Sequence, residues 1–264
     1  MVKKIGIISI KGGVGKTSSV ASLGASLAND FNKKVLLVDA NFSAPNLGLH
    51  LGLINPEYTL HHVLNNKAHT YKAIYKTEYG FHVIPGSLFY QNINPFKLRD
   101  KLKDIEKGYD IILIDSSPTL NEEILSTMIA SDELLVVTTP DISTLSTTLR
   151  AIKIAKQRKT PISGLILNKV YNKDFELSLE EIEETSGCSV LAVIPHDISI
   201  PKTQSEYVPL TINNSGMASR EYKKLAGMLI GDEYKESIMR RILNKFRIKL
   251  PKQEVNRAII LDNY

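Results

Sequence analysis

The chain has 264 residues, of which 43% are hydrophobic and 23% charged, and its formal net charge is +5. This length allows one large domain or two small ones with a substantial core. No apolar run reaches the ~20 residues that a membrane-spanning helix needs, and the N-terminus lacks the pattern of a signal peptide. The single cysteine, Cys188, excludes an intrachain disulfide and a CxxC metal or cluster site, and it fits a reducing cytosol.

Short apolar segments alternate along the chain with longer segments of helical periodicity. The expected strands are 5–10, 34–38, 80–85, 111–115, 133–138, 161–168 and 189–194, and the expected helices are 15–29, 59–64, 96–105, 143–156, 177–185 and 217–230. This alternation predicts a doubly wound α/β fold, with a mostly parallel sheet and helices on both faces. Ligands of such sheets bind at the carboxyl ends of the strands. The residues at or just past those ends, which we expect on one edge, are Asp39, Asp115, Pro140, Asn168 and Pro195.

A glycine-rich segment, residues 11–18 (KGGVGKTS), lies between the first expected strand and the first helix. Its glycines let successive N–H groups point at one anion, and the helix that follows adds the positive end of its dipole. Lys16 can reach the outer phosphates, and the Thr17 hydroxyl can hold Mg²⁺. The sequence therefore predicts the phosphate-binding loop of a P-loop NTPase, formed by Gly12, Gly13, Val14, Gly15, Lys16, Thr17 and Ser18.

Two other interpretations of this segment are an ordinary tight turn and a dinucleotide-binding fingerprint. The second has some support, because Gly13-x-Gly15 opens a helix and Asp39 follows at roughly the expected distance. Ser18 stands at its third glycine position, however, and Gly-Lys-Thr is not part of that fingerprint. The strict pattern GxxxxGK[ST] also fails at one point, since it requires glycine where this chain has Ile10.

Residues 11–17 resemble the deviant Walker A loop of the MinD/ParA family of ATPases, whose ParA-type members often lack the first glycine as well. The extra lysine of that family matches Lys11. In family members it reaches across a dimer interface to the nucleotide of the partner. The resemblance therefore implies an ATP-dependent homodimer with ATP buried between two copies of the chain.

Further motifs extend the resemblance over residues 3–230. Residues 37–41 (LVDAN) occupy the switch I position, 44–49 (APNLGL) resemble MinD rather than ParA, and 109–118 (YDIILIDSSP) look like Walker B and switch II. Residues 138–141, 167–169 and 194–195 also fall where the family has motifs. The resemblance implies a P-loop ATPase domain of residues 1–232 with ATP and Mg²⁺ as cofactors.

The reaction implied is phosphoryl transfer to water, in which positioning and charge neutralisation supply most of the catalysis. By resemblance, the catalytic residues are Lys11, Lys16, Asp39 and Asn41, the metal site is Thr17, Asp39 and Asp115, and the nucleotide is also contacted by Asn168 and Pro195. Asn168 matches the asparagine that recognises adenine. Two plainer interpretations stay open: Asp115 could be a helix N-cap, and Asn168 an ordinary turn residue.

Asn41 departs from the family, because most members have an aspartate there that orients the attacking water. Asparagine can hydrogen-bond to a water molecule but cannot take its proton. One interpretation is slow hydrolysis, with Asn41 positioning the water as glutamine does in some GTPases. The other is a protein that binds ATP and dimerises with negligible hydrolysis.

Residues 233–264 are expected to form a basic amphipathic helix and a tail. Six lysines or arginines and one glutamate lie between residues 235 and 249, an excess equal to the net charge of the whole chain. Apolar residues recur there at helical spacing. MinD proteins carry a C-terminal amphipathic helix that binds anionic membrane, so the resemblance implies membrane binding through 235–250. The alternatives are packing on the core and binding of a protein or nucleic acid, and 252–264 have no assigned role.

The sequence therefore predicts a MinD-like ATPase that dimerises around Mg-ATP and positions a protein partner in cell division or spatial organisation. We expect it in the cytoplasm, peripheral at the inner face of the cell membrane. One alternative is a ParA-like DNA-segregation ATPase that binds DNA without reading sequence. The nearly neutral body and residues 44–49 count against it. A second alternative is an ATP-bound regulatory protein that barely hydrolyses ATP because of Asn41.

Overall fold

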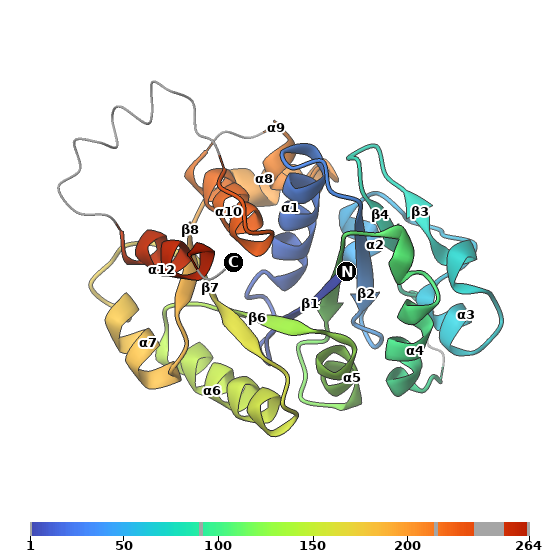
Figure 1. The fold of residues 1–264 in the computed structure, drawn as a ribbon, viewed down its shortest axis with the longest axis horizontal. Coiled ribbons are helices and arrows are strands. Elements are labelled where there is room, and N and C mark those ends of the chain that lie inside the picture. The colour runs from blue at the N-terminus through green and yellow to red at the C-terminus, as the bar shows by residue number, and fades with distance from the viewer. Residues whose placement is uncertain (1, 90–91, 214–215, 235–250, 263–264) are drawn as a thin grey trace.

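The computed structural model describes residues 2–89, 92–213, 216–234 and 251–262 (Figure 1). Its centre is an eight-stranded sheet with the strand order β3-β4-β2-β5-β1-β6-β7-β8. The strands are β1 (Lys3–Ile8), β2 (Val35–Ala40), β3 (Tyr75–Lys76), β4 (His82–Ile84), β5 (Ile111–Ser116), β6 (Glu133–Thr138), β7 (Ile162–Val170) and β8 (Val190–Pro195). All neighbouring strands are parallel except β3, which is antiparallel to β4. The predicted doubly wound, mostly parallel sheet is confirmed.

Helices cover both faces of the sheet (Figure 1). One face carries α1 (Lys16–Asn29), α2 (Leu47–His50), α8 (Ser199–Ser205), α9 (Leu210–Asn213), α10 (Met217–Leu229) and α12 (Lys252–Leu261). The other carries α3 (Leu60–Leu64), α4 (Leu98–Lys103), α5 (Glu122–Ala130), α6 (Ile142–Gln157) and α7 (Leu179–Ser186). Three short 3₁₀ helices are η1 (Thr70–Ala73), η2 (Pro95–Lys97) and η3 (Glu106–Gly108). The helix expected over 96–105 is thus divided between η2 and α4.

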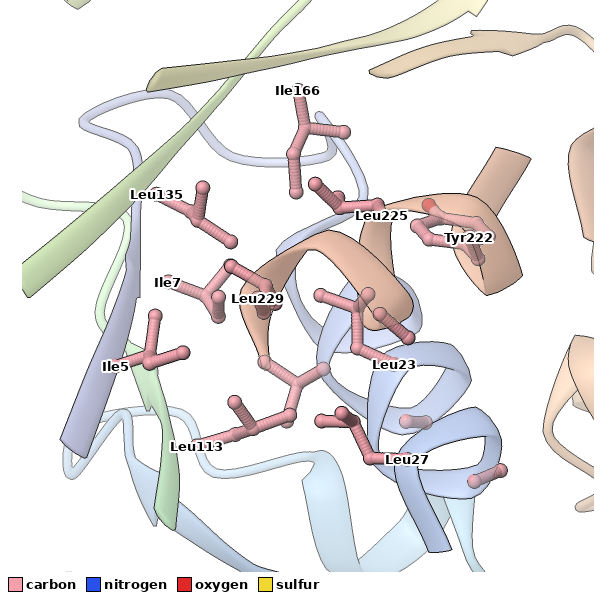
Figure 2. Packing of buried hydrophobic residues seen from close by; sticks show 14 of the residues in the cluster. Ile5, Ile7, Leu23, Leu27, Leu113, Leu135, Ile166, Tyr222, Leu225 and Leu229 are labelled. Carbon is pink, nitrogen blue, oxygen red and sulfur yellow. The ribbon is translucent and has the colours of Figure 1, made fainter. Parts of the chain in front are cut away.

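The largest buried cluster lies between the sheet and helices α1 and α10 (Figure 2). Ile5 and Ile7 of β1 point into it, whereas Ile8 points to the opposite face, as the alternation of side chains along a strand requires. Helix α1 packs closely on β2, because Gly24 faces Leu37: a Cβ at Gly24 would lie 2.6 Å from the Leu37 Cδ2 atom. This layer fixes the position of α1, and with it the loop that precedes α1.

The predicted amphipathic segment 235–250 lies outside the described residues, so the domain division at residue 232 stays a prediction. Helix α12 follows it and packs beside the edge strand β8. The Asn256 side chain donates a hydrogen bond to the Val190 carbonyl (2.9 Å), and the buried Arg257 guanidinium donates to the Leu191 carbonyl (2.8 Å) and to Glu221 (3.0 Å). Residues 252–261, to which the sequence assigned no role, therefore lie against the ATPase body and cover a sheet edge. Within the described ranges, no helix has the length and apolar character needed to cross a membrane.

Candidate functional site

The glycine-rich loop connects β1 to α1, and its backbone needs glycine at two positions. Gly13 and Gly15 have φ angles of 74° and 97°, in the left-handed region. Gly15 is also the N-cap of α1, and a Cβ there would overlap the side-chain amide of Asn168. No acidic residue lies in the first turn of α1, so the helix itself supplies no negative charge at its positive end. The loop therefore has the geometry and the polarity of a phosphate site.

A cavity of about 380 Å³ opens over this loop. The sequence-predicted residues that line it are Gly12, Gly13, Gly15, Lys16, Thr17, Ser18, Asn41 and Asn168. Val14 is buried and lines an adjacent cavity, and Pro195 ends β8 next to the lining residue His196. Lys11 lines the same adjacent cavity, of about 280 Å³. The nucleotide-loop cavity is thus lined by residues from the loops that follow β1, β2, β5 and β8 and from the carboxyl end of β7.

Asp39 and Asp115 lie directly beside each other under this cavity, because they are paired in register on neighbouring strands. Both are fully buried. Asp39 accepts backbone N–H bonds from Leu47 (3.0 Å) and Asn41 (3.3 Å), while the Thr17 hydroxyl donates to Asp115 Oδ2 (2.6 Å). Burial, together with the charge of Asp115, raises the pKa of Asp39 well above its usual value, and burial raises the pKa of Asp115 to about 6.

Two buried oxygens at this site have no hydrogen-bond partner in the described part of the chain: Asp115 Oδ1 and Asn41 Oδ1. Buried polar atoms without partners are rare and destabilising, so they indicate a ligand that completes the site. Mg²⁺ prefers hard oxygen ligands and keeps several bound waters. A hydroxyl and two carboxylates, from Thr17, Asp39 and Asp115, match that preference, so the residues present fit a magnesium–nucleotide complex.

Lysines occupy both ends of the loop. The Lys16 side chain is buried and donates to the Lys11 carbonyl (3.3 Å), and burial lowers the pKa of its ammonium group against the opposing effect of Asp115. Lys11 extends the other way, where its Nζ lies 2.7 Å from the Thr144 hydroxyl and 3.4 Å from Asp141, the N-cap of α6. In this structure Lys11 therefore contacts a helix of its own chain.

The Asn168 carboxamide holds the loop from the end of β7. Its Nδ2 donates to the Val14 carbonyl (2.7 Å), and its Oδ1 accepts from the backbone N–H of Lys169 (2.9 Å). It thus has a loop-positioning contact that the sequence did not indicate. The adenine-recognition roles of Asn168 and Pro195 stay predictions.

Sequence reasoning missed three residues that shape this site. Asn46 lines the cavity, and its Oδ1 lies 2.9 Å from the Thr17 hydroxyl. Glu123 and His61 hold the segment that follows Asp39, through contacts to Ser43 and Phe42. The local signal for Glu123 was Asn121, whose side chain caps α5 ahead of an acidic first turn. His61 has no comparable local signal, because its partners are distant in the sequence.

Comparison with known proteins agrees with this geometry. A family model described as an AAA domain matches residues 2–163. An uncharacterized ATP-binding protein of Methanocaldococcus jannaschii is 35% identical over 245 residues, which cover 91% of this chain and 92% of the relative. The septum site-determining protein MinD of Pyrococcus horikoshii, solved with Mg-ADP, is 32% identical with a TM-score of 0.82, over 87% of this chain and 96% of that one. The chain belongs to the MinD/ParA family of ATPases. Its cofactors are ATP and Mg²⁺.

The similarity is on the MinD side of the family. MinD of Aquifex aeolicus, solved in complex with MinC, is 26% identical with a TM-score of 0.80, over 89% of this chain and 98% of that one. The similarity to these MinD structures extends over most of both chains, so the family assignment concerns the whole ATPase body.

Replacing Asp115 by Asn tests whether the paired carboxylates form the metal site. The variant removes one of two adjacent buried charges, so we expect the free energy of unfolding of the nucleotide-free protein to rise by about 1 kcal/mol. The additional stabilisation by Mg²⁺ in the presence of ATP should be lost. Chemical denaturation with ATP, with and without Mg²⁺, measures both effects. The exposed Asp104→Asn change is the matched control, and a less stable Asp115→Asn protein that kept its Mg²⁺ response would contradict this assignment.

Proposed function

We propose that this protein is a MinD-like switch that dimerises around Mg-ATP, hydrolyses it slowly and positions a protein partner. The observation that carries the proposal is the set of unpartnered oxygens, Asp115 Oδ1 and Asn41 Oδ1, beside the Walker-type loop. In this proposal Thr17, Asp39 and Asp115 hold Mg²⁺ and its waters, and Lys16 and the loop bind the phosphates. Mg²⁺ supplies charge neutralisation at the phosphates, while the residues around it orient the nucleotide.

A row of exposed apolar side chains supports the homodimer. Each follows a parallel strand of the sheet, so each lies on the same edge as the phosphate loop. They are Phe89 after β4, Leu120 after β5, Ile142 after β6, Tyr171 and Phe175 after β7, and Ile198 after β8, with exposures between 50% and 84%. An extended apolar surface of this kind is typical of an interface. A second copy meeting this edge would cover the row and enclose the nucleotide, within reach of Lys11.

Size-exclusion chromatography tests the dimer. With ATP and Mg²⁺ the wild type should elute as a dimer, and Lys11→Ala should remain a monomer because it loses the charge that would contact the nucleotide of the partner. Phe175→Asp should weaken the dimer about tenfold or more, since it places a charge in the apolar edge. Tyr71→Asp, on η1 away from this edge, is the matched control. A monomer in every condition would refute the sandwich model.

Slow hydrolysis follows from Asn41, which lines the cavity and whose carboxamide can accept a hydrogen bond from water without taking its proton. We expect Asn41→Asp to raise kcat by about tenfold or more, because a carboxylate adds general-base capacity. Steady-state phosphate release gives this rate, and Asn41→Ala should fall below the wild type. An unchanged rate in Asn41→Asp would mean that this position does not limit turnover.

The proposed partners are a protein and an anionic membrane. MinD of Aquifex aeolicus forms a complex with MinC, which supports a protein partner for this chain. Residues 235–250 carry the basic and apolar residues that membrane attachment requires. Two such segments in one dimer would bind more strongly than one, so attachment would follow the nucleotide state. The proposed location is the cytoplasm, with the dimer at the inner face of the cell membrane.

Sedimentation with vesicles separates this proposal from a ParA-like one. With ATP, the wild type should sediment with vesicles containing anionic lipid and not with neutral vesicles. Ile242→Asp should reduce that binding about tenfold, because it interrupts the apolar positions of 235–250. Val255→Asp on the exposed side of α12 is the control. Salt-dependent binding to random duplex DNA without vesicle binding would instead support the DNA-segregation alternative.

A further inference from the structure

The segment after β2 carries Asn41, and its conformation sets the direction of the Asn41 side chain. The Asn41 Nδ2 donates to the Ala44 carbonyl three residues later (2.6 Å). This contact fixes the carboxamide of Asn41, which lines the nucleotide cavity, and its buried Oδ1 has no hydrogen-bond partner among the described residues. Whatever holds residues 42–44 in place therefore also holds the Asn41 side chain in the lining of the cavity.

Glu123, in the first turn of α5, is one of the groups that hold this segment. Its Oε2 accepts the backbone N–H of Ser43 (3.3 Å), and its Oε1 accepts the Ser43 hydroxyl. The Glu123 side chain is buried, at 7% exposure, although Ser43 itself is exposed. No lysine or arginine forms an ion pair with Glu123 among the described residues. A buried carboxylate without a cation is stabilised by its hydrogen bonds and by the positive end of its helix, here α5. Loss of the hydrogen bonds to Ser43 would therefore leave the Glu123 carboxylate poorly stabilised.

His61 of α3 holds the neighbouring residue. Its Nδ1 accepts the backbone N–H of Ser87 (3.0 Å), so the ring proton must be on Nε2, which donates to the Phe42 carbonyl (3.1 Å). The His61 ring also meets the Phe42 ring edge-on, with centroids 5.7 Å apart. Burial lowers the pKa of His61, which agrees with a neutral ring that keeps both contacts. Two consecutive residues after Asn41 are thus held by two separate helices.

We propose that Glu123 is a positioning residue for ATP hydrolysis, which acts by holding residues 42–44 so that the Asn41 carboxamide keeps its place in the lining of the nucleotide cavity. This inference rests on the proposed hydrolytic function. Glu123 also links two cavity-lining loops, because Ser116 and Pro118 precede α5 and line the same cavity as Asn41. The Glu123–Ser43 contact therefore connects the loop after β2 to the segment after β5, so that the two are expected to move together.

Steady-state kinetics of three variants tests the role of Glu123. Glu123→Ala should lower kcat about tenfold with KM for ATP within about twofold, since the phosphate loop is untouched and only the placement of Asn41 is lost. Glu123→Gln should stay within about threefold of the wild type, because its amide can accept from the Ser43 N–H and donate to the Ser43 hydroxyl. Glu122→Ala is the matched control: Glu122 is the exposed neighbour in the same helical turn, so its loss should leave kcat and KM unchanged.

A second measurement needs no ATP and so separates this inference from the proposed function. The chain contains no tryptophan, so Ala44→Trp, at an exposed position, provides a single fluorescent reporter in the segment. Acrylamide quenching of this reporter should rise about twofold or more when Glu123→Ala is added, and should not change with Glu123→Gln or Glu122→Ala.

The outcomes can be told apart. A wild type without ATPase activity would refute the proposed hydrolysis, while the quenching result would still decide whether Glu123 holds the segment. If Glu123→Ala does not fold, Ser43→Ala at the exposed end of the contact takes its place, with an expected loss of about threefold in kcat and an intermediate rise in quenching. Unchanged kcat and unchanged quenching in the variant that folds would overturn the inference, as would equal losses in Glu123→Ala and Glu122→Ala.

Discussion

The burial of two adjacent carboxylates is the constraint on which the rest of this site depends. The parallel pairing of β2 and β5 places Asp39 and Asp115 in the same register under the phosphate loop. Their mutual repulsion is offset in part by backbone N–H donors, by the Thr17 hydroxyl and by the buried Lys16 ammonium. Among the described residues Asp115 Oδ1 has no partner, so a divalent cation carried in with ATP would relieve a cost already present in the folded chain. In the proposed function, nucleotide binding and local conformation would therefore be coupled.

This coupling would extend to the loops after β2, β4 and β5, because these three loops pack against one another at the same edge of the sheet. Glu123 joins the loop after β5 to Ser43 in the loop after β2, and His61 joins that loop to Ser87 after β4. Gly86 completes the contact, since a Cβ there would collide with the Pro45 ring. A change at the carboxylates can therefore reach the loops that carry Phe89 and Leu120 through direct contacts.

The sequence predicted those parts of the fold whose signal is local. Strand β6 has the predicted bounds, and β5 is one residue longer than predicted. Both were predictable because a strand buried on both faces consists of an unbroken run of apolar residues. The positions of Asp39, Asp115 and Asn168 then followed from parallel topology alone. Helices α8 and α9 were missed because they are short and are stabilised by packing on the sheet face rather than by periodicity. The Glu123–Ser43 contact spans 80 residues and has no local signal.

The buried carboxylates of Asp39 and Asp115 also offer a reason for an asparagine, rather than an aspartate, at position 41. Its backbone N–H donates to Asp39, and its side chain is 6% exposed, so an aspartate here would add a third carboxylate to a pair whose pKa values are already raised. A neutral carboxamide avoids that repulsion and still offers an oxygen to water. The substitution thus exchanges proton-accepting capacity for a lower electrostatic cost in the nucleotide-free protein. In the proposed function, a site built this way would favour a long-lived ATP-bound state over rapid turnover, which is the property that a positioning switch requires.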